Sequence, residues 1–319
     1  MISLADIEAA RERIAGSAVR TPLVRLYAGE DEAAADTEIY LKLETLQPVG
    51  AFKLRGAMNA ILSAPAAARA QGLVTASAGN MAQGLAWVAR DLGLPATIAV
   101  PEHAPEAKLA AIERLGGRVL KMPYDDWWQV IVTSVIEGVP GLFVHPVQDE
   151  GVMAGNGTIG LEILEDVPDP DAVLIPYGGG GLTVGVATAI RALRPETKIY
   201  AVEPETGAAL GAALAAGGPA EVDYRASFVD GAGSREVLAP MWPLVCALVD
   251  GAIAVSLAET AQAVRVLAGS ARVVAEGAGA LAVAAARSGR AGTGKIVCIV
   301  SGGNINLSTL AEILAGATP

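Results

Sequence analysis

The feature that most constrains this chain is a regular alternation of continuous apolar, β-prone runs with segments of helical periodicity. Eight such runs cover residues 73–77, 96–101, 118–122, 142–146, 172–177, 198–204, 252–256 and 295–301. Strands that are apolar throughout are buried on both faces, and the helices between them supply the cover. The pattern therefore predicts an α/β fold of open, twisted parallel sheets with helices on both faces.

The spacing of these runs also predicts how the chain divides. At roughly 100–200 residues per domain, a chain of 319 residues predicts two domains. Four strand-like runs follow one another between residues 73 and 146, so we expect 71–146 to form a small domain. Residues 1–70 and 147–319 would form a large one. In such sheets ligands bind beyond the carboxyl ends of the strands, so the loops there are the first places to look for chemistry.

Composition narrows the classes of partner. Hydrophobic residues make up 52% of the chain, which is ample for a buried core. Lys and Arg number 23 against 34 Asp and Glu, so the net charge of −11 disfavours nucleic acid and anionic membranes as partners. The uncharged stretch 172–190 contains Pro176 and five glycines. It is therefore interpreted as a strand, a glycine loop and a helix rather than a membrane span.

Several motif classes are disfavoured by what the sequence lacks. Cys246 and Cys298 have no metal or redox spacing, and the charged, amphipathic N-terminus is not typical of a signal peptide. We therefore expect a cytoplasmic protein, and no regulatory domain after residue 319. Two histidines outside any ligand cluster, and no G-x-S-x-G, argue against a zinc site and a serine hydrolase.

Three glycine patterns compete as phosphate sites. Residues 155–160 fit G-x-G-x-x-G but do not directly follow a strand, so we interpret them as a glycine-rich helix start that packs against the sheet. Residues 289–295 fit G-x-x-x-x-G-K, but Lys295 opens a strand, which rejects a P-loop. Gly178–Gly181 directly follow a strand and precede a helix. Bare amides and a helix N-terminus predict a phosphate cradle there.

Three further segments carry polar groups at promising places. Lys53 lies among small and apolar residues in GAFKLRGA, where desolvation would lower the pKa of its amine and make it a nucleophile. The segment Ser77–Gly84 follows a strand and opens a helix, so its amides could bind a carboxylate. Ser301 ends the last strand, where its hydroxyl could bond a ring nitrogen. Taken singly, each pattern also fits an ordinary lysine, helix cap or turn.

Together, GAFKLRGA, SAGNMAQG, GGGGL and SGGN resemble the fold-type II pyridoxal-phosphate enzymes, in their order and spacing. The threonine/serine dehydratase and serine racemase branch is the most similar. The resemblance extends over nearly the whole chain and includes residues 145–164, 201–204 and 276–282. It implies a tryptophan synthase β-like fold with pyridoxal 5′-phosphate in the cleft between two domains, and a homodimer.

The resemblance also implies a role for each matching residue. Lys53 would bind the cofactor as a Schiff base and act as base on the substrate α-proton, and Phe52 would lie beside the ring. Asn80 would bond the ring hydroxyl, and Ser301 the ring nitrogen. The remaining assignments are the phosphate site, Gly178, Gly179, Gly180, Gly181 and Leu182, and the substrate site, Ser77, Ala78, Gly79, Asn80, Met81 and Trp128.

These roles imply β-elimination from a small amino-acid substrate. The cofactor is an electron sink that makes the α-C–H acidic. A neutral hydroxyl at the ring nitrogen, instead of a carboxylate, favours expulsion of a β-hydroxyl over transamination. We therefore expect a β-hydroxy-α-amino acid to be dehydrated and deaminated to a 2-oxo acid and ammonia.

The chain departs from the family pattern at several positions. Met81 and Ala51 stand where the family usually has His and Ser. Ala78 matches the serine that supplies the acid in racemases, so racemisation is the disfavoured alternative. Glu203 matches one carboxylate of a cation site, but Ala209 replaces the second, so we expect no bound metal and keep Glu203 as a weak candidate.

The adjacent tryptophans, Trp127 and Trp128, are the last unusual feature. They fit core packing of a helix, or a pocket for an aromatic substrate such as phenylserine. An alternative of another class is an inactive protein that binds an amino acid or the cofactor. The retained Lys53 argues against that alternative, because simple binding does not need a Schiff base.

Overall fold

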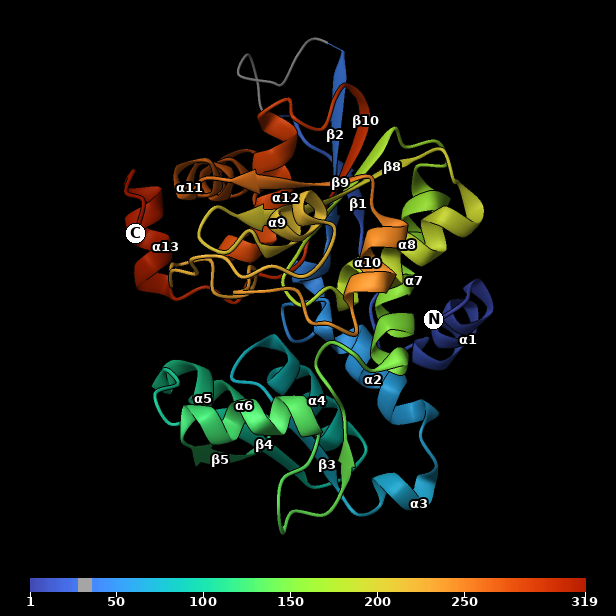
Figure 1. Ribbon diagram of the computed structural model, residues 1–319, viewed down its shortest axis with the longest axis vertical. Coiled ribbons are helices and arrows are strands. Elements are labelled where there is room, and N and C mark those ends of the chain that lie inside the picture. Colours follow the sequence, from blue (N-terminus) through green and yellow to red (C-terminus); the bar gives the residue numbers. More distant parts are fainter. Residues whose placement is uncertain (28–35) are drawn as a thin grey trace.

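The computed structural model describes residues 1–27 and 36–319. It contains two sheets, one in the upper and one in the lower part of the molecule in Figure 1, with helix α2 (Lys53–Ser63) between them. In the part of the chain that is described, no helix is long and apolar enough to cross a membrane.

The larger sheet has six strands in the order β1-β2-β10-β7-β8-β9. All neighbouring pairs are parallel except β1 and β2, which pair antiparallel at one edge. The strands are β1 (Leu23–Arg25), β2 (Thr37–Leu43), β7 (Ala172–Pro176), β8 (Lys198–Pro204), β9 (Gly251–Val255) and β10 (Gly294–Val300).

Side chains of this sheet alternate between two apolar layers. Val173 and Ile175 of β7 point into one layer and Leu174 into the other. Helices cover both layers, as expected for strands buried on both faces. The first layer is covered by α1 (Leu4–Ile14), α7 (Glu150–Asp166), α8 (Gly181–Leu193), α9 (Ala209–Ala216) and α10 (Trp242–Leu248), and the second by α11 (Leu257–Val266), the π-helical turn η3 (Leu267–Ala271), α12 (Gly277–Arg287) and α13 (Leu307–Leu314).

The smaller sheet has four parallel strands in the order β5-β4-β3-β6. One face packs against α2, α4 and α5, and the other against α6 (Figure 1). Its elements are β3 (Leu73–Ala76), α4 (Asn80–Asp91), β4 (Ala96–Pro101), α5 (Glu106–Arg114), β5 (Arg118–Met122), α6 (Tyr124–Thr133) and β6 (Leu142–Phe143). The short helices η2 (Glu44–Leu46) and α3 (Ala66–Arg69) flank α2 along the chain.

All eight apolar runs contain the strands predicted for them, and the α/β fold with parallel sheets is confirmed. The edge strand β1 and its neighbour β2 are additions to that prediction. The strands of the smaller sheet all lie between residues 73 and 143. The domain boundaries themselves stay a prediction.

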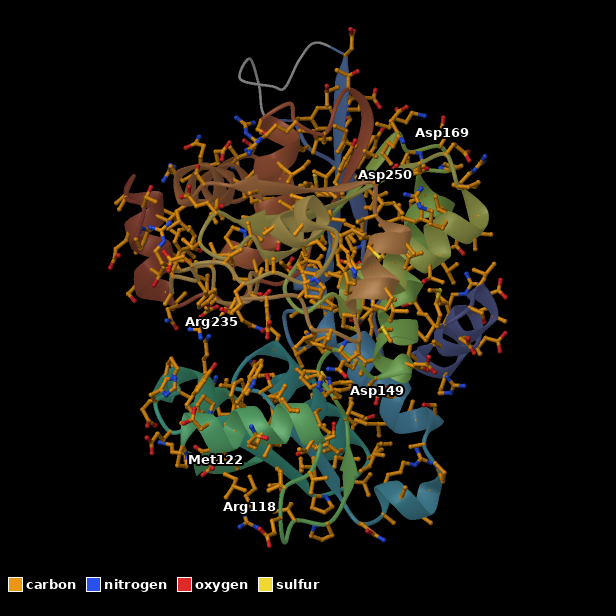
Figure 2. The ribbon with its side chains drawn as sticks, in the orientation of Figure 1. Arg118, Met122, Asp149, Asp169, Arg235 and Asp250 are labelled. Atoms are coloured by element: carbon orange, nitrogen blue, oxygen red, sulfur yellow. The ribbon has the colours of Figure 1, made fainter. Side chains whose placement is uncertain are left out.

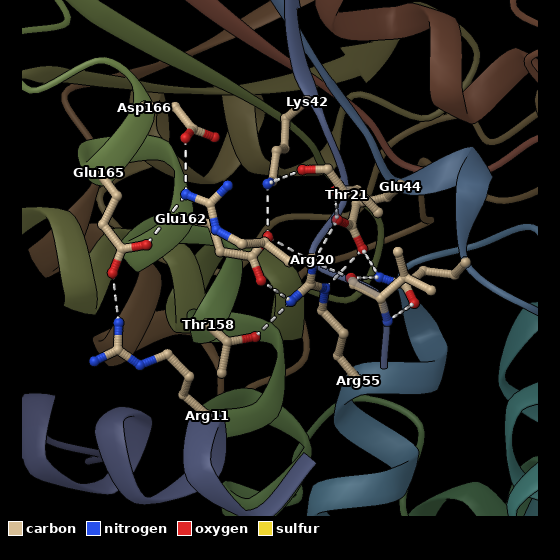
Figure 3. A network of polar contacts seen from close by, with 12 residues as sticks. Arg11, Arg20, Thr21, Lys42, Glu44, Arg55, Thr158, Glu162, Glu165 and Asp166 are labelled. Carbon is tan, nitrogen blue, oxygen red and sulfur yellow. Dashed lines mark hydrogen bonds and ion pairs between the residues drawn. The ribbon is translucent and has the colours of Figure 1, made fainter. Parts of the chain in front are cut away.

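Arg55, in the first turn of α2, is the centre of a buried ion network (Figure 3). Its guanidinium donates two hydrogen bonds to Glu44 at 2.8 and 2.9 Å and two to Glu162 at 2.7 and 2.8 Å. Lys42 of β2 pairs with Glu162 Oε2 at 2.6 Å, an oxygen that also accepts from Arg55. Two cations thus balance two carboxylates, and the network joins α2 to β2, η2 and α7.

Glycines let α7 approach its neighbours closely. A Cβ on Gly155 would overlap the carbonyl oxygen of Arg55, and one on Gly157 would lie 2.9 Å from the carbonyl oxygen of Gly185 in α8. Contacts below 3.0 Å cannot be accommodated without movement of the backbone. The glycines at 155–160 are therefore packing positions, but they lie inside α7 and pack against α2 and α8, not at a helix start against the sheet.

We expect Arg55→Lys to lower the free energy of unfolding by about 3–5 kcal/mol, because one ammonium cannot pair with both carboxylates and a buried charge is left uncompensated. The matched control is Arg20→Lys. Arg20 pairs with Glu165 and Asp166 at the outer end of the same region, where its side chain is 51% exposed (Figure 3). Loss of these exposed ion pairs in Arg20→Lys should lower the free energy of unfolding by at most about 1 kcal/mol. Urea unfolding followed by tryptophan fluorescence measures both; equal losses would contradict the role given to Arg55.

Candidate active site

Lys53 is the first residue of α2, and the residues before it are fixed to the end of β10. The amide of Phe52 donates to the carbonyl oxygen of Ser301 at 3.0 Å, and Ala51 forms an antiparallel bridge with Gly302. The amide of Gly303 bonds back to Gly50 at 2.9 Å. These bonds bring two segments that are far apart in the sequence, GAFK and SGGN, to one place.

The Lys53 amine lies in an environment that disfavours its charge. Nζ donates to the carbonyl oxygen of Pro146 at 2.8 Å and lies 5.3 Å from the centroid of the Phe52 ring. No carboxylate pairs with it among the described residues. Burial lowers the pKa of Lys53 to about 8. Near neutral pH, a lysine of this kind therefore carries a much larger fraction of uncharged, nucleophilic amine than an exposed lysine does.

The amine opens into a cavity of about 380 Å³, including its open mouth. The wall is made of backbone and small or apolar side chains from several parts of the chain. The lining residues are Phe52, Lys53, Val147, Pro176, Gly178, Gly179, Gly180, Gly181, Leu182, Gly231 and Ser301.

The glycine loop at one end of this cavity has the form of an anion cradle. Gly180 has a φ of +95°, and a Cβ on Gly179 would lie 2.5 Å from the Val147 side chain. A Cβ on Gly181 would lie 2.8 Å from the Val147 carbonyl oxygen. Within the described chain, the amides of residues 178–182 donate to no other residue. They are left to the cavity, where the N-terminus of α8 adds its positive end.

Ser301 lies at another part of the wall, and its residue is 4% exposed. It provides a neutral hydroxyl beside the lysine. The fit to pyridoxal phosphate is therefore good on three counts: an amine with a lowered pKa, free amides in a cradle that glycine alone can form, and an uncharged hydrogen-bonding group.

The segment 77–81 forms the start of α4, in the smaller sheet's layer. Ser77 Oγ accepts from the amide of Gly79 at 3.1 Å, and Ala78 packs partly against the core beneath it. Met81 is buried in that core, so its side chain is not available to a ligand. Helix N-termini of this kind attract carboxylates.

Asn80 is connected to two residues from the end of the chain. Its Nδ2 donates to Glu276 at 2.7 Å, and its Oδ1 accepts from Asn304 at 2.8 Å. Burial raises the pKa of Glu276 to about 7. The amide group of Asn80 is thereby held in one orientation, with the second hydrogen of Nδ2 free.

The two adjacent tryptophans lie differently on α6. Trp127 donates from Nε1 to the carbonyl oxygen of Ala99 at 3.2 Å and packs against the smaller sheet. Trp128 is 37% exposed, and it is not among the residues that line the cavity. Core packing therefore accounts for Trp127 but not for Trp128.

Glu203, the weak cation candidate, has both oxygens in use. They accept from the amides of Leu210 and Gly211, at the start of α9, at 2.8 and 2.9 Å. Burial raises the pKa of Glu203 to about 7, and the two amides partly offset this rise. Residues 1–27 and 36–319 hold no cluster of three or more metal-ligating side chains.

The cavity thus brings together Phe52, Lys53, the four glycines, Leu182 and Ser301. Five further residues were not predicted from the sequence: Val147, Pro176 and Gly231 in the wall, and Glu276 and Asn304 at the Asn80 contact. Val147, Glu276 and Asn304 lie inside segments that carry the family resemblance, which was the available signal. Gly231 lies in an irregular loop with no such signal.

Comparison with known proteins agrees with this geometry. The model of the pyridoxal-phosphate dependent enzyme family matches residues 14–302. The L-threonine ammonia-lyase of Thermotoga maritima is 40% identical over 317 residues, which cover 98% of this chain and 78% of the relative.

Solved structures match equally widely. Maize serine racemase has a TM-score of 0.90 at 32% identity, covering 98% of this chain and 97% of the other. The processed threonine deaminase isoform 2 of Solanum lycopersicum has a TM-score of 0.86 at 33% identity, covering 98% and 92%. By its sequence, its fold and the residues around Lys53, the chain belongs to the pyridoxal-phosphate-dependent enzyme family, whose cofactor is pyridoxal 5′-phosphate.

Proposed function

We propose that this protein is an ammonia-lyase that eliminates water from a β-hydroxy-α-amino acid and releases a 2-oxo acid and ammonia. The observation that carries the proposal is the position of the Lys53 amine, in one cavity with the glycine cradle and the neutral Ser301 hydroxyl. The names of the relatives, threonine ammonia-lyase and threonine deaminase, support the same reaction.

Each residue has a distinct task in this proposal. Gly178–Gly181 and Leu182 would hold the phosphate through backbone amides, Phe52 would lie beside the ring and Asn80 would bond the ring hydroxyl. When bound, the cofactor supplies an electron sink that acidifies the substrate α-C–H. Lys53 binds the cofactor and takes the α-proton at Nζ, for which a pKa of about 8 suits neutral conditions.

Ser301 and the start of α4 direct the outcome. Ser301 would present a neutral hydroxyl and no negative charge to the ring nitrogen, which would favour expulsion of the β-hydroxyl. The amides and the Ser77 hydroxyl at residues 77–81 hold the substrate carboxylate at the positive end of α4. Because the lining is largely backbone and apolar surface, few competing polar side chains meet the substrate.

The likeness to serine racemase favours racemisation as the second candidate. Racemisation needs an acid on the face opposite the lysine, and Ala78 has no proton to give. We therefore propose elimination as the main reaction. We further propose, from the family resemblance, a homodimer in the cytoplasm.

For the substrate, we propose a bulky or aromatic β-substituent, as in phenylserine. What supports this is Trp128, whose indole is exposed while its neighbour Trp127 anchors the helix. The loss of polar side chains at Ala51 and Met81 points the same way.

The reaction is tested by measuring 2-oxo acid and ammonia released from L-serine, L-threonine and DL-threo-phenylserine. We expect Lys53→Ala to lower kcat by at least about 10²–10⁴-fold, because both the covalent attachment and the proton transfer depend on Nζ. Lys121→Ala, at an exposed lysine paired with Glu106, is the control and should keep full activity. Oxo-acid release by Lys53→Ala at the wild-type rate would exclude the proposed role.

The lowered pKa of Lys53 also predicts how the cofactor-free protein responds to pH. Between pH 8 and 10.5 the unfolded chain binds more protons at this residue than the folded one, so stability should rise with pH. Lys53→Met should be more stable than wild type at pH 7, by about 1–3 kcal/mol, and this difference should shrink above pH 8. Melting temperatures of both proteins and of Lys121→Met measure it; a constant difference across this range would contradict the shifted pKa.

The proposed pocket predicts a selective loss in Trp128→Ala. We expect kcat/KM for phenylserine to fall by about 3- to 10-fold, since an aromatic contact is removed, while kcat/KM for threonine changes little. Tyr27→Ala, at another exposed aromatic residue, serves as the control. The proposed preference is wrong if the wild type strongly prefers threonine. It is also wrong if Trp128→Ala lowers kcat/KM equally for phenylserine and threonine.

A further inference from the structure

His145 occupies the point where the chain returns from the smaller sheet to the larger one. It comes two residues after β6 and four before Asp149, which caps α7 and lies between the two parts of the molecule in Figure 2. The residue is 7% exposed. A buried imidazole at such a crossing needs partners for both of its nitrogens.

Both ring nitrogens have partners, and these define the tautomer. Nδ1 lies 3.0 Å from the amide nitrogen of Val147 and 2.9 Å from that of Gln148, while Nε2 lies 3.1 Å from the carbonyl oxygen of Ile131. Amides can only donate and a carbonyl can only accept. The ring is therefore neutral, with its proton on Nε2 and a lone pair on Nδ1 shared by two amides.

The turn held by this lone pair touches both ends of the cofactor cavity. The carbonyl oxygen of Pro146 accepts from Lys53 Nζ at 2.8 Å. The next residue, Val147, lines the cavity and lies against the cradle, where a Cβ on Gly179 would come within 2.5 Å of its side chain. Movement of residues 146–148 would thus shift the carbonyl oxygen that binds Lys53 Nζ and, with it, the Val147 side chain that packs against the glycine loop.

We propose that His145 is a positioning residue for the cofactor site. It acts through the backbone of residues 146–148, which fixes the position of the Lys53 amine relative to the phosphate cradle. This role rests on the cofactor-binding function proposed for Lys53, and His145 itself touches neither cofactor nor substrate. Through Ile131 the ring also joins α6 to this turn, so the helix that carries Trp128 is connected to the lysine by one side chain.

The electrostatics are consistent with the geometry. Burial lowers the pKa of His145; the Ile131 carbonyl acts against this, and the nearby Lys53 ammonium adds to the lowering. A proton on Nδ1 would face two N–H donors, so both hydrogen bonds would be lost and the turn at residues 146–148 would have to move. A histidine that merely filled the core would not need two backbone amides converging on an unprotonated Nδ1.

Two substitutions separate the two ends of the ring. In His145→Asn, Oδ1 can take the place of Nδ1 and accept from Val147 and Gln148. In His145→Gln, the longer amide can reach Ile131 but presents no acceptor at the Nδ1 position. The chain's other histidine, His103, is exposed after β4 and gives the control His103→Asn.

The measurement is the dissociation constant of pyridoxal phosphate, titrated into cofactor-free protein and followed by the absorbance of the bound cofactor. We expect His145→Asn and His103→Asn to stay within about threefold of wild type, since the acceptor is kept. His145→Gln should bind at least about tenfold more weakly and shift the absorbance band, because two amides lose their acceptor. Equal dissociation constants for His145→Asn and His145→Gln, or weakening that only follows the melting temperatures, would overturn the proposal.

A second measurement does not depend on any variant folding well. With two histidines in the chain, the imidazole ¹⁵N shifts of the wild-type holoenzyme report the tautomer directly. We expect one ring that is neutral and protonated on Nε2 from about pH 6 to 8. An imidazolium, or a proton on Nδ1, would overturn the proposal. Neither measurement depends on release of oxo acid. Failure of the proposed role of His145 can therefore be distinguished from failure of the proposed reaction.

Discussion

The position of Lys53 depends on the buried ion network around Arg55. Arg55 lies in the same first helical turn as the lysine, and its bonds to Glu44 and Glu162 fix that turn against β2 on one side and α7 on the other. Burying four charges is costly unless all are paired, so the network tolerates one arrangement of these elements and few others. Among the described residues, Lys53 has no carboxylate partner. Its helix is held instead by the ion pairs of Arg55 with Glu44 and Glu162.

A second constraint acts from the opposite side of the cavity. The turn at 146–148 brings a carbonyl oxygen to Lys53 Nζ and a valine to the glycine loop, and glycine is required where that valine approaches. The same rule of close approach recurs in α7, where Gly155 meets the backbone of Arg55. The ion network and the return turn meet in α2 and α7, so the rigidity of the site comes from helix packing rather than from the loops that line it.

Local chemistry explains what could be predicted from the sequence. The eight apolar runs can be recognised as strands from consecutive residues alone, without reference to a distant partner. β2 was not predicted because it carries Glu38 and Lys42, and Lys42 is buried only because Glu162, far along the chain, pairs with it. β1 has three residues, too few for a periodic signal. β2 was thus missed because its buried charge depends on a long-range ion pair, and β1 was missed because it is short.

The same distinction applies to the site. The lysine and the glycine loop are readable because their chemistry lies in consecutive residues, whereas the bond between Asn80 and Glu276 spans 196 positions. His145 shows why a residue type alone is insufficient, since its role follows from three partners and not from its ring. Trp127 and Trp128 are equivalent in the sequence, yet one bonds Ala99 and the other stays exposed. Neighbours on a helix point about 100° apart, so packing one indole into the sheet turns the other outward. In the proposed substrate preference, Trp128 is therefore the member of the pair that would contact the substrate, and Trp127 fixes the helix that carries it.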